Sequence, residues 1–401
     1  MKDLNNLIKF IRSTFHEPAE FIPLHDPRFI GNEKKYLNES IDSNVVSSVG
    51  EFVGRFEQMC AEFTGSNYAV AAMNGTSALH IALLLAGVQR DDEVITQALT
   101  FIATANAISY TGAKPVFIDV DKDTMGLSPT ALEAWLNENV EMRDQEKPEA
   151  QSQVPHNKQT NRRIAACVPM HTFGHPIKLS ELQVICDRYN IPLIEDSAES
   201  IGSYYKGKHT GTFGKLGILS FNGNKLITTG GGGMILTDDE ELAKKAKHLT
   251  TQAKVPHPYE FMHDHIGYNY RLTNVNAAIG CAQMESLDYL LSLKRNLADQ
   301  YKSFFKNSDL TFFEEPTDCQ SNYWLNAIIT KDKTERDELL QFSNANGVMM
   351  RPIWELMNRL PMFADCQTDA LENSIWFADR VVNIPSTAII EGYRKQLVSQ
   401  G

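Results

Sequence analysis

Two short segments of the chain carry charged residues that could do chemistry together. Lys225 lies between an apolar run and four consecutive glycines, 230–233. Lysine normally belongs on a solvated surface, and an amine withdrawn from water loses proton affinity and becomes a nucleophile for carbonyl groups. Asp196 and Glu199 follow another apolar run, where an acid is costly to bury unless its charge meets a partner. An N-cap or a surface carboxylate is the alternative interpretation of Asp196.

A third segment, Gly75-Thr76-Ser77, separates an apolar run from a helical pattern. Glycine lets a backbone come close to a ligand, and the free amides and dipole of a helix N-terminus favour an anion. We call Gly75–Ser77 the phosphate cup. The same pattern also fits an ordinary strand–turn–helix connection in which Ser or Thr caps the helix.

One cofactor would use all three segments. Pyridoxal phosphate needs a lysine to bond, a carboxylate that keeps its pyridine nitrogen protonated, and a site for its phosphate. Lys225, Asp196 and the phosphate cup supply one of each. Phe101 follows an apolar run that ends at Gln97 and could cover the face of the cofactor ring, although a place in the core is the alternative for this side chain.

Two other patterns imitate functional sites. The segment 202–208 resembles a nucleotide-binding loop, but His209 stands where Ser or Thr must hold magnesium. His171 and His175 have the i, i+4 spacing of a metal pair, but the nearby Gly174 and a proline disfavour a helix, and no third ligand is evident. We therefore expect no metal site, and we interpret His171 and His175 as part of a loop at a strand end near the cofactor.

These residues need a scaffold that brings strand ends together. Several apolar runs are continuous and do not alternate with polar residues, which is typical of strands buried on both faces of a mainly parallel sheet flanked by helices. Ligands of such sheets bind beyond the carboxyl ends of the strands. We predict strands at Tyr68–Met73, Glu93–Gln97, Pro115–Val120, Ile164–Met170, Leu193–Asp196, Ile218–Phe221 and Gly233–Thr237, with helices such as Ser77–Ala86, Ser180–Tyr189 and Glu240–Leu249 between them.

The alternation of short apolar runs with helical patterns ends near residue 273. A long helical stretch, Thr273–Phe305, leads into shorter strand and helix patterns, which predict a smaller C-terminal α+β domain. We place the boundary inside this helix, with a large domain at 1–285, including an N-terminal amphipathic helix, and a small domain at 286–401. The segment Asn137–Arg163 has almost no large apolar residues, and we expect it to be a solvated excursion on the surface.

Composition excludes several classes of protein. The chain has 401 residues, 42% of them hydrophobic, and a formal net charge of −12 with no basic run, so nucleic acid is not an expected partner. No stretch approaches the 18 or so apolar residues of a membrane span, and the N-terminus lacks the features of a signal peptide. The six cysteines are scattered, which predicts free thiols and a cytoplasmic protein.

These motifs resemble those of the DegT-type sugar aminotransferases, a pyridoxal-phosphate family of fold type I, over nearly the whole chain. Any one motif is weak, but their order and spacing together are specific. Within this family, segments such as 22–25, 46–50 and 351–354 most resemble the branch that acts in legionaminic acid and bacillosamine synthesis. The motifs are Asn74–His80, Thr100–Thr104, His171–Gly174, Glu195-Asp196, Ser220–Lys225 and Gly267–Arg271.

The resemblance implies a role for each matching residue. Lys225 would form the internal aldimine and shuttle the proton, and Asp196 would pair with the pyridinium nitrogen. Glu199 stands where many relatives carry Gln against the phenolic oxygen of the cofactor, so a carboxylate there would require a shared proton. The other implied contacts are phosphate binding by Gly75, Thr76, Ser77 and Ser220, stacking by Phe101, and phosphate binding by Asn269 from the partner of a homodimer with shared active sites.

The resemblance also implies a reaction. An amino donor, glutamate by resemblance, would pass its amino group to C4 of a UDP-linked 4-keto-2-acetamido-2,6-dideoxyhexose, giving a UDP-4-amino sugar for surface-glycan synthesis. The presence of Lys225 favours transamination over the dehydratases of the family, in which histidine replaces the lysine. The alternative is a non-catalytic binding or regulatory protein that keeps the fold and the cofactor.

Overall fold

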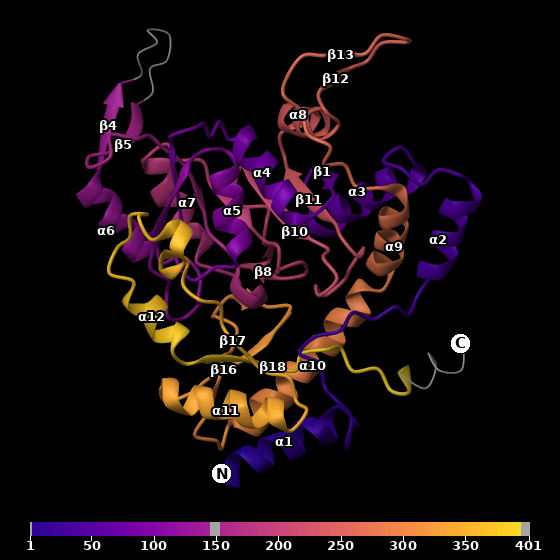
Figure 1. Cartoon of the computed structure of the whole chain (residues 1–401), viewed down its shortest axis with the longest axis vertical. Coiled ribbons are helices and arrows are strands. Elements are labelled where there is room, and N and C mark those ends of the chain that lie inside the picture. Colours follow the sequence, from indigo (N-terminus) through magenta and orange to yellow (C-terminus); the bar gives the residue numbers. More distant parts are fainter. Residues whose placement is uncertain (1, 145–152, 394–401) are drawn as a thin grey trace.

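The computed structural model describes residues 2–144 and 153–393. Its centre is a seven-stranded sheet (Figure 1) in which β7 and β6 join through two parallel bridges. Only β11 runs antiparallel to its neighbours within the described sheet. The strand order is β1 (Tyr68–Ala72), β11 (Gly233–Thr237), β10 (Leu216–Ser220), β7 (Ile194–Asp196), β6 (Ile164–Val168), β2 (Glu93–Gln97) and β3 (Lys114–Ile118).

Both faces of this sheet are buried, as the continuous apolar runs predict. In β1, Val70 packs into the cluster formed with α4, α5 and α8, whereas Ala71 packs on the opposite face with α3 and α9. A third cluster joins β2, β3 and β6 to α6 and α7. The helices are α2 (Glu33–Asp42), α3 (Glu51–Thr64), α4 (Gly75–Leu85), α5 (Ile102–Tyr110), α6 (Pro129–Asn139), α7 (Leu179–Arg188), α8 (Glu240–Thr250) and α9 (Asn274–Glu285).

A second unit lies below the sheet in Figure 1, built on a four-stranded sheet of order β14-β16-β18-β17. The N-terminal helix α1 (Lys2–Thr14) packs here, because Leu7 and Ile11 belong to the same apolar cluster as Leu297 of α10. The other elements are α10 (Leu287–Phe305), β14 (Thr311–Phe312), β16 (Asn326–Ile329), α11 (Lys333–Ala345), β17 (Arg351–Pro352), α12 (Glu372–Ala378) and β18 (Val381–Ile384).

Two hairpins leave the body of the molecule (Figure 1). β4 (Val140–Asp144) and β5 (Gln153–Asn157) pair within the segment expected to be a solvated excursion, and Asn157 anchors it by donating to the Glu93 carboxylate at 2.7 Å. β12 (Lys254–Val255) and β13 (Met262–His263) form the second hairpin. We call residues 254–266 the arm.

Most predicted elements agree with the structure to within a few residues, and the differences have local causes. The helical stretch 273–305 is two helices, because the backbone breaks at Ser286 between α9 and α10. The segment 202–208 forms part of a small sheet of β15 (Cys319–Gln320), β8 (Tyr204–Tyr205) and β9 (Lys208–His209), and no helix follows it.

The predicted division at residue 285 coincides with this break, although α1 packs on the second unit. The division therefore stays a prediction. None of the helices within the described residues is long and apolar enough to cross a membrane.

Candidate active site

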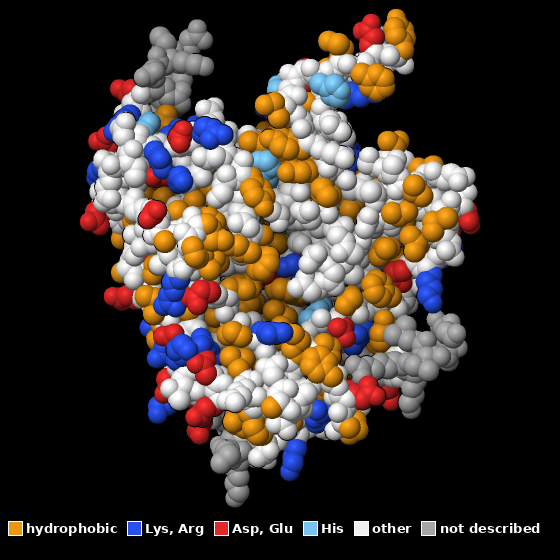
Figure 2. Space-filling view, in the orientation of Figure 1, with side chains coloured by type: hydrophobic (Ala, Val, Ile, Leu, Met, Phe, Trp, Pro, Cys, Tyr) orange, Lys and Arg blue, Asp and Glu red, His pale blue; other side chains and the backbone are white. Residues whose placement is uncertain are grey.

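A cavity of about 780 Å³ lies at the carboxyl ends of the parallel strands, between the sheet and the second unit. Figure 2 shows hydrophobic side chains gathered around the middle of this face. The sequence-predicted site residues that line the cavity are Gly75, Thr76, Phe101, Asp196, Glu199, Ser220 and Lys225. These seven residues lie at or after the carboxyl ends of four strands, β1, β2, β7 and β10, and meet as predicted for a parallel sheet.

The phosphate cup forms the N-terminus of α4. Asn74 is its N-cap, and Asn74 Oδ1 accepts a hydrogen bond from the Ser77 amide at 2.8 Å. A Cβ at Gly75 would lie 3.0 Å from the Ser220 Cβ, so the glycine allows the helix to approach β10 closely. Ser77 is buried and does not line the cavity, whereas Thr76 does. The cap residue is thus Asn74, and the binding role of Ser77 stays a prediction.

Asp196 ends β7 as a buried carboxylate with two hydrogen-bond donors. Thr104, on α5, donates to Oδ2 at 2.7 Å, and the Ala198 amide donates to Oδ1 at 3.2 Å. Burial raises the pKa of Asp196, and these two hydrogen bonds oppose that rise. Sequence reasoning assigned no role to Thr104, which lies in the first turn of α5, the helix that follows β2.

Lys225 and Glu199 face each other inside the cavity. Lys225 Nζ lies 3.3 Å from Glu199 Oε1 and 4.0 Å from the centroid of the Trp324 ring. Glu199 Oε2 accepts a hydrogen bond from the Phe173 amide at 2.9 Å. Burial, with the negative charge of Asp196, raises the pKa of Glu199 to about 7 against the opposing effects of Lys225 and the Phe173 amide. Near neutral pH this carboxyl group can therefore hold or release a proton beside the lysine.

The backbone that supports Glu199 is unusual. Phe173 has a φ of 57°, and Gly174 a φ of 95°. A Cβ at Gly174 would lie 1.8 Å from Asn322 Oδ1, so glycine is required there. Asn322 donates to the carbonyl oxygens of Glu199 and Ile201 at 2.8 and 2.9 Å, and its Oδ1 accepts from the Trp324 amide at 2.8 Å. One asparagine of the second unit thus fixes the backbones of both neighbours of the lysine.

Glu195 and His171 serve the fold and not the cavity. Glu195 accepts hydrogen bonds from three backbone amides, of which that of Phe213 is 2.6 Å long, and lies 3.1 Å from His171 Nε2. Burial would raise the pKa of Glu195, but His171 and the amides lower it. His175 packs edge-on against Phe313 and Tyr323, and burial lowers its pKa to about 4.

Several lining residues were not assigned from the sequence. Trp324, Arg351 and Trp354 come from the second unit and Leu24 from the N-terminal segment. The sequence indicated only a family resemblance for the segment 351–354 and no binding role. The arginine and tryptophan of this segment, next to residues with a strand pattern, are a signal that could have identified it as part of a binding site.

Asn269 does not line the cavity of its own chain. Its side chain is exposed, yet its segment runs beside the start of the phosphate cup, because the Met73 amide donates to the Tyr270 carbonyl at 2.7 Å. The predicted contact with a partner's phosphate therefore stays a prediction.

The described residues fit pyridoxal phosphate. A buried lysine, a buried carboxylate, and a helix N-terminus with a glycine pressed against Ser220 surround one cavity. Such a site at the carboxyl edge of a parallel sheet defines a pyridoxal-phosphate enzyme of fold type I.

Comparison with known proteins agrees. The model of the DegT/DnrJ/EryC1/StrS aminotransferase family matches residues 27–399. The chain belongs to this family, and it is a pyridoxal phosphate-dependent sugar aminotransferase.

Relatives match along nearly the whole length. GDP-perosamine synthase of Escherichia coli O157:H7 is 38% identical over 368 residues, 92% of this chain and 93% of that protein. GDP-perosamine synthase of Vibrio cholerae is 35% identical over 370 residues, 91% of this chain and 94% of that protein. The structure of Helicobacter pylori PseC, an aminotransferase involved in the biosynthesis of pseudoaminic acid, shares the fold, with a TM-score of 0.82, 23% identity, and coverage of 95% of this chain and 98% of that one.

Proposed function

We propose that the enzyme moves an amino group from glutamate to C4 of a nucleotide-linked 4-keto-6-deoxyhexose. The observation that carries this proposal is the placement of Lys225, Asp196 and Glu199 around one cavity of about 780 Å³. That volume is within the range of small-molecule sites, which is roughly 300–1,000 Å³. An alternating reaction with two substrates needs one site that admits each in turn.

Each charged residue has a distinct task in this proposal. Pyridoxal phosphate supplies an electron sink for the carbon that bears the amino group. Lys225 Nζ would accept the proton that leaves that carbon and would return it to the carbon on the other side of the amino nitrogen. Asp196 stays ionised to hold a proton on the pyridine nitrogen, with Thr104 donating to its carboxylate. Glu199, 3.3 Å from Lys225, accepts or supplies a proton as the lysine changes charge.

The remaining predicted contacts hold the cofactor. Gly75, Thr76, Ser77 and Ser220 would bind its phosphate, and Phe101 would stack on its ring. Phe101 is 46% exposed at the cavity wall, and its ring centroid lies 6.1 Å from that of Trp354. A ring stacked against it would cover this surface and exclude water from the reacting carbon.

The nucleotide of the sugar is the finer question. The sequence led us to expect a UDP-linked 2-acetamido sugar of the bacillosamine or legionaminic acid type. Two relatives named GDP-perosamine synthase, at 38% and 35% identity, favour a GDP-linked sugar as the second candidate. Arg351 lines the cavity, and no ion pair of its side chain occurs within the described residues. Its guanidinium would bind the diphosphate that both candidates share.

A homodimer with shared sites belongs to the same proposal. The arm carries exposed apolar side chains, with Tyr259 at 80%, Phe261 at 81% and Ile266 at 84% exposure. In Figure 2 this arm projects from the body with hydrophobic side chains at its tip. Apolar surface of this kind marks an interaction site, and we propose that a second copy covers it and brings Asn269 to the neighbouring phosphate cup.

A half-reaction screen tests the proposed substrates. The enzyme is converted to its pyridoxamine form with glutamate, separated from donor, and mixed with GDP-linked and UDP-linked 4-keto sugars, each with and without a 2-acetamido group. We expect the cofactor absorbance to return with only one class, and NMR of the product to place the amine at C4. The Lys225→Ala variant is the control.

Several outcomes would overturn the proposal. An amine at another carbon would exclude C4, and return of absorbance with neither nucleotide class would exclude both sugars. A protein that binds the cofactor and responds to no amino donor would support the non-catalytic alternative.

A further inference from the structure

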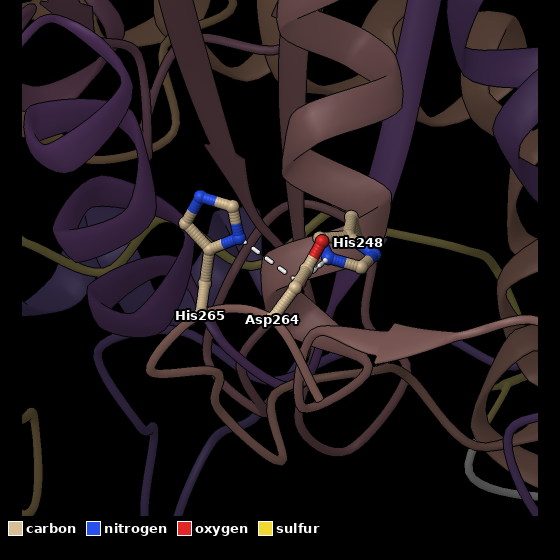
Figure 3. A group of neighbouring side chains, drawn as sticks. All are labelled: His248, Asp264 and His265. Atoms are coloured by element: carbon tan, nitrogen blue, oxygen red, sulfur yellow. Dashed lines mark hydrogen bonds and ion pairs between the residues drawn. The ribbon is translucent and has the colours of Figure 1, made fainter. Parts of the chain in front are cut away.

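Three metal-ligating side chains converge at the base of the arm, outside the cavity. His248 lies in the last turn of α8, whereas Asp264 and His265 follow β13. One ligand atom of each lies within 4.8 Å of the others. Figure 3 shows both imidazole rings on either side of the Asp264 carboxylate.

Backbone contacts hold these two segments together. The Ala253 amide donates to the His248 carbonyl at 2.9 Å, and the Asp264 amide donates to the Ala253 carbonyl at 3.3 Å. Lys254 and His263 are paired in the hairpin, so Asp264 comes directly after the last pair. The local fold therefore places residues 248 and 264 side by side before any ligand is bound.

Both histidine side chains contact the same carboxylate oxygen of Asp264. Asp264 Oδ1 lies 2.6 Å from His248 Nε2 and 2.9 Å from His265 Nδ1. Among the described residues, Asp264 has no lysine or arginine as an ion-pair partner, so neither competes for its charge.

The geometry points to a divalent transition metal ion, with zinc as the fitting case: we propose that His248, Asp264 and His265 bind it at the base of the arm. Two imidazole nitrogens and one carboxylate oxygen are ligands that zinc accepts, whereas magnesium and calcium prefer oxygen alone. Ligand atoms on a tetrahedral zinc ion lie about 3.3 Å apart, given bond lengths of about 2.0–2.1 Å. The contacts of Asp264 with His248 and His265, now 2.6 and 2.9 Å, would need to open by about 0.7 and 0.4 Å to reach this separation.

The partial exposure of the cluster suits such a site. The side chains of His248, Asp264 and His265 are 27%, 48% and 57% exposed. An ion can therefore enter from solvent, and water can fill the fourth position. A bound ion would join α8 to the strand that leaves the arm, and would restrict the motion of the arm at its base. This proposal does not depend on the substrate of the enzyme.

Zinc binding to the tag-free holoenzyme tests the site. Competition with a chromophoric chelator should show one zinc ion bound per chain, and cobalt in its place should give the visible bands of a four-coordinate ion. Asp264→Asn and His265→Gln should each weaken binding by at least about tenfold, since even a residue that only supports a ligand is worth that much. His263→Gln is the matched control, because His263 Nδ1 contacts the Gln252 carbonyl at 2.8 Å and lies outside the cluster.

A second measurement guards against variants that misfold. Limited proteolysis of the arm should slow when zinc is added to the wild type and to His263→Gln, and should not change in Asp264→Asn. Circular dichroism without zinc should match for all variants. Binding that persists in an Asp264→Asn, His265→Gln double variant, binding lost equally in His263→Gln, or no stoichiometric binding to the wild type would each overturn the proposal.

Discussion

Replacing Glu199 by Gln should change how the stability of the apoenzyme depends on pH. The raised pKa of Glu199, about 7 against an ordinary value of 4.5, means that the folded protein holds this proton more tightly than the unfolded chain does. The stability that the proton provides is complete below pH 4.5 and is lost as the pH rises through 7. Gln has the shape of the protonated acid and cannot ionise, so the variant lacks this loss.

The magnitude follows from the shift. A pKa of about 7 in place of 4.5 corresponds to about 3 kcal/mol once the carboxyl group is ionised in both states. Between about pH 5.5 and about pH 8.5, the wild type should therefore lose about 2 kcal/mol relative to Glu199→Gln. Urea unfolding of both apoenzymes at one protein concentration measures this difference, because effects of other titrating groups largely cancel.

Glu195→Gln is the matched control, since Glu195 is equally buried but has a lowered pKa. A lowered pKa gives stability that is present above the ordinary value and is lost only as the pH falls through the folded pKa. Glu195→Gln should therefore be destabilised by the same amount at both pH values. If the difference between the wild type and Glu199→Gln does not change with pH, the assignment of a raised pKa to Glu199 is wrong.

The other predictions concern the proposed chemistry and assembly. Lys225→Arg should bind the cofactor without a covalent link, because guanidinium stays protonated; a cofactor trapped on this variant by borohydride would refute the role of the lysine. Asp196→Asn should slow the glutamate half-reaction by about 10²-fold, or some 3 kcal/mol, measured by stopped-flow absorbance; a near-normal rate would move the role to another carboxylate. Thr104→Val removes a hydrogen bond to a charged group, worth about 1.5–3 kcal/mol, and should slow the same step without loss of thermal stability beyond that amount. Asn269→Ala should weaken cofactor binding about ten- to a hundredfold, and mixing with Lys225→Ala subunits should restore one normal site per heterodimer; no recovery at limiting cofactor would show that the sites are not shared.

The sequence predicted the sheet and its strand ends well, for a physical reason. Glu93–Gln97 and Gly233–Thr237 have the predicted bounds, because strands buried on both faces have a clear apolar pattern and end at polar residues. Lys225 and Asp196, which follow such strands, therefore line one cavity, as the sequence predicted. The break at Ser286 was missed, because the apolar pattern continues through it.

The cavity-lining residues of the second unit could not be predicted from local sequence patterns. Trp324 lies about a hundred residues from Lys225 in the sequence, and no local period reports a contact of that range. The helix α1 shows the same limit. Its amphipathic pattern predicted a helix, but not that its apolar face packs against α10.

The hydrogen bonds of Asn322 constrain one part of the cavity lining more than the rest. They fix the backbones of Glu199 and Trp324, and so hold the surroundings of the lysine in one arrangement. Arg351 takes no part in these hydrogen bonds and lies on the short edge strand β17, whose neighbour is β18. Trp354 lies beyond the strand and packs on Phe173, with ring centroids 5.0 Å apart. Changing the specificity for the acceptor sugar would therefore begin at Arg351, where a new side chain can reshape the cavity while the hydrogen bonds around the lysine stay in place.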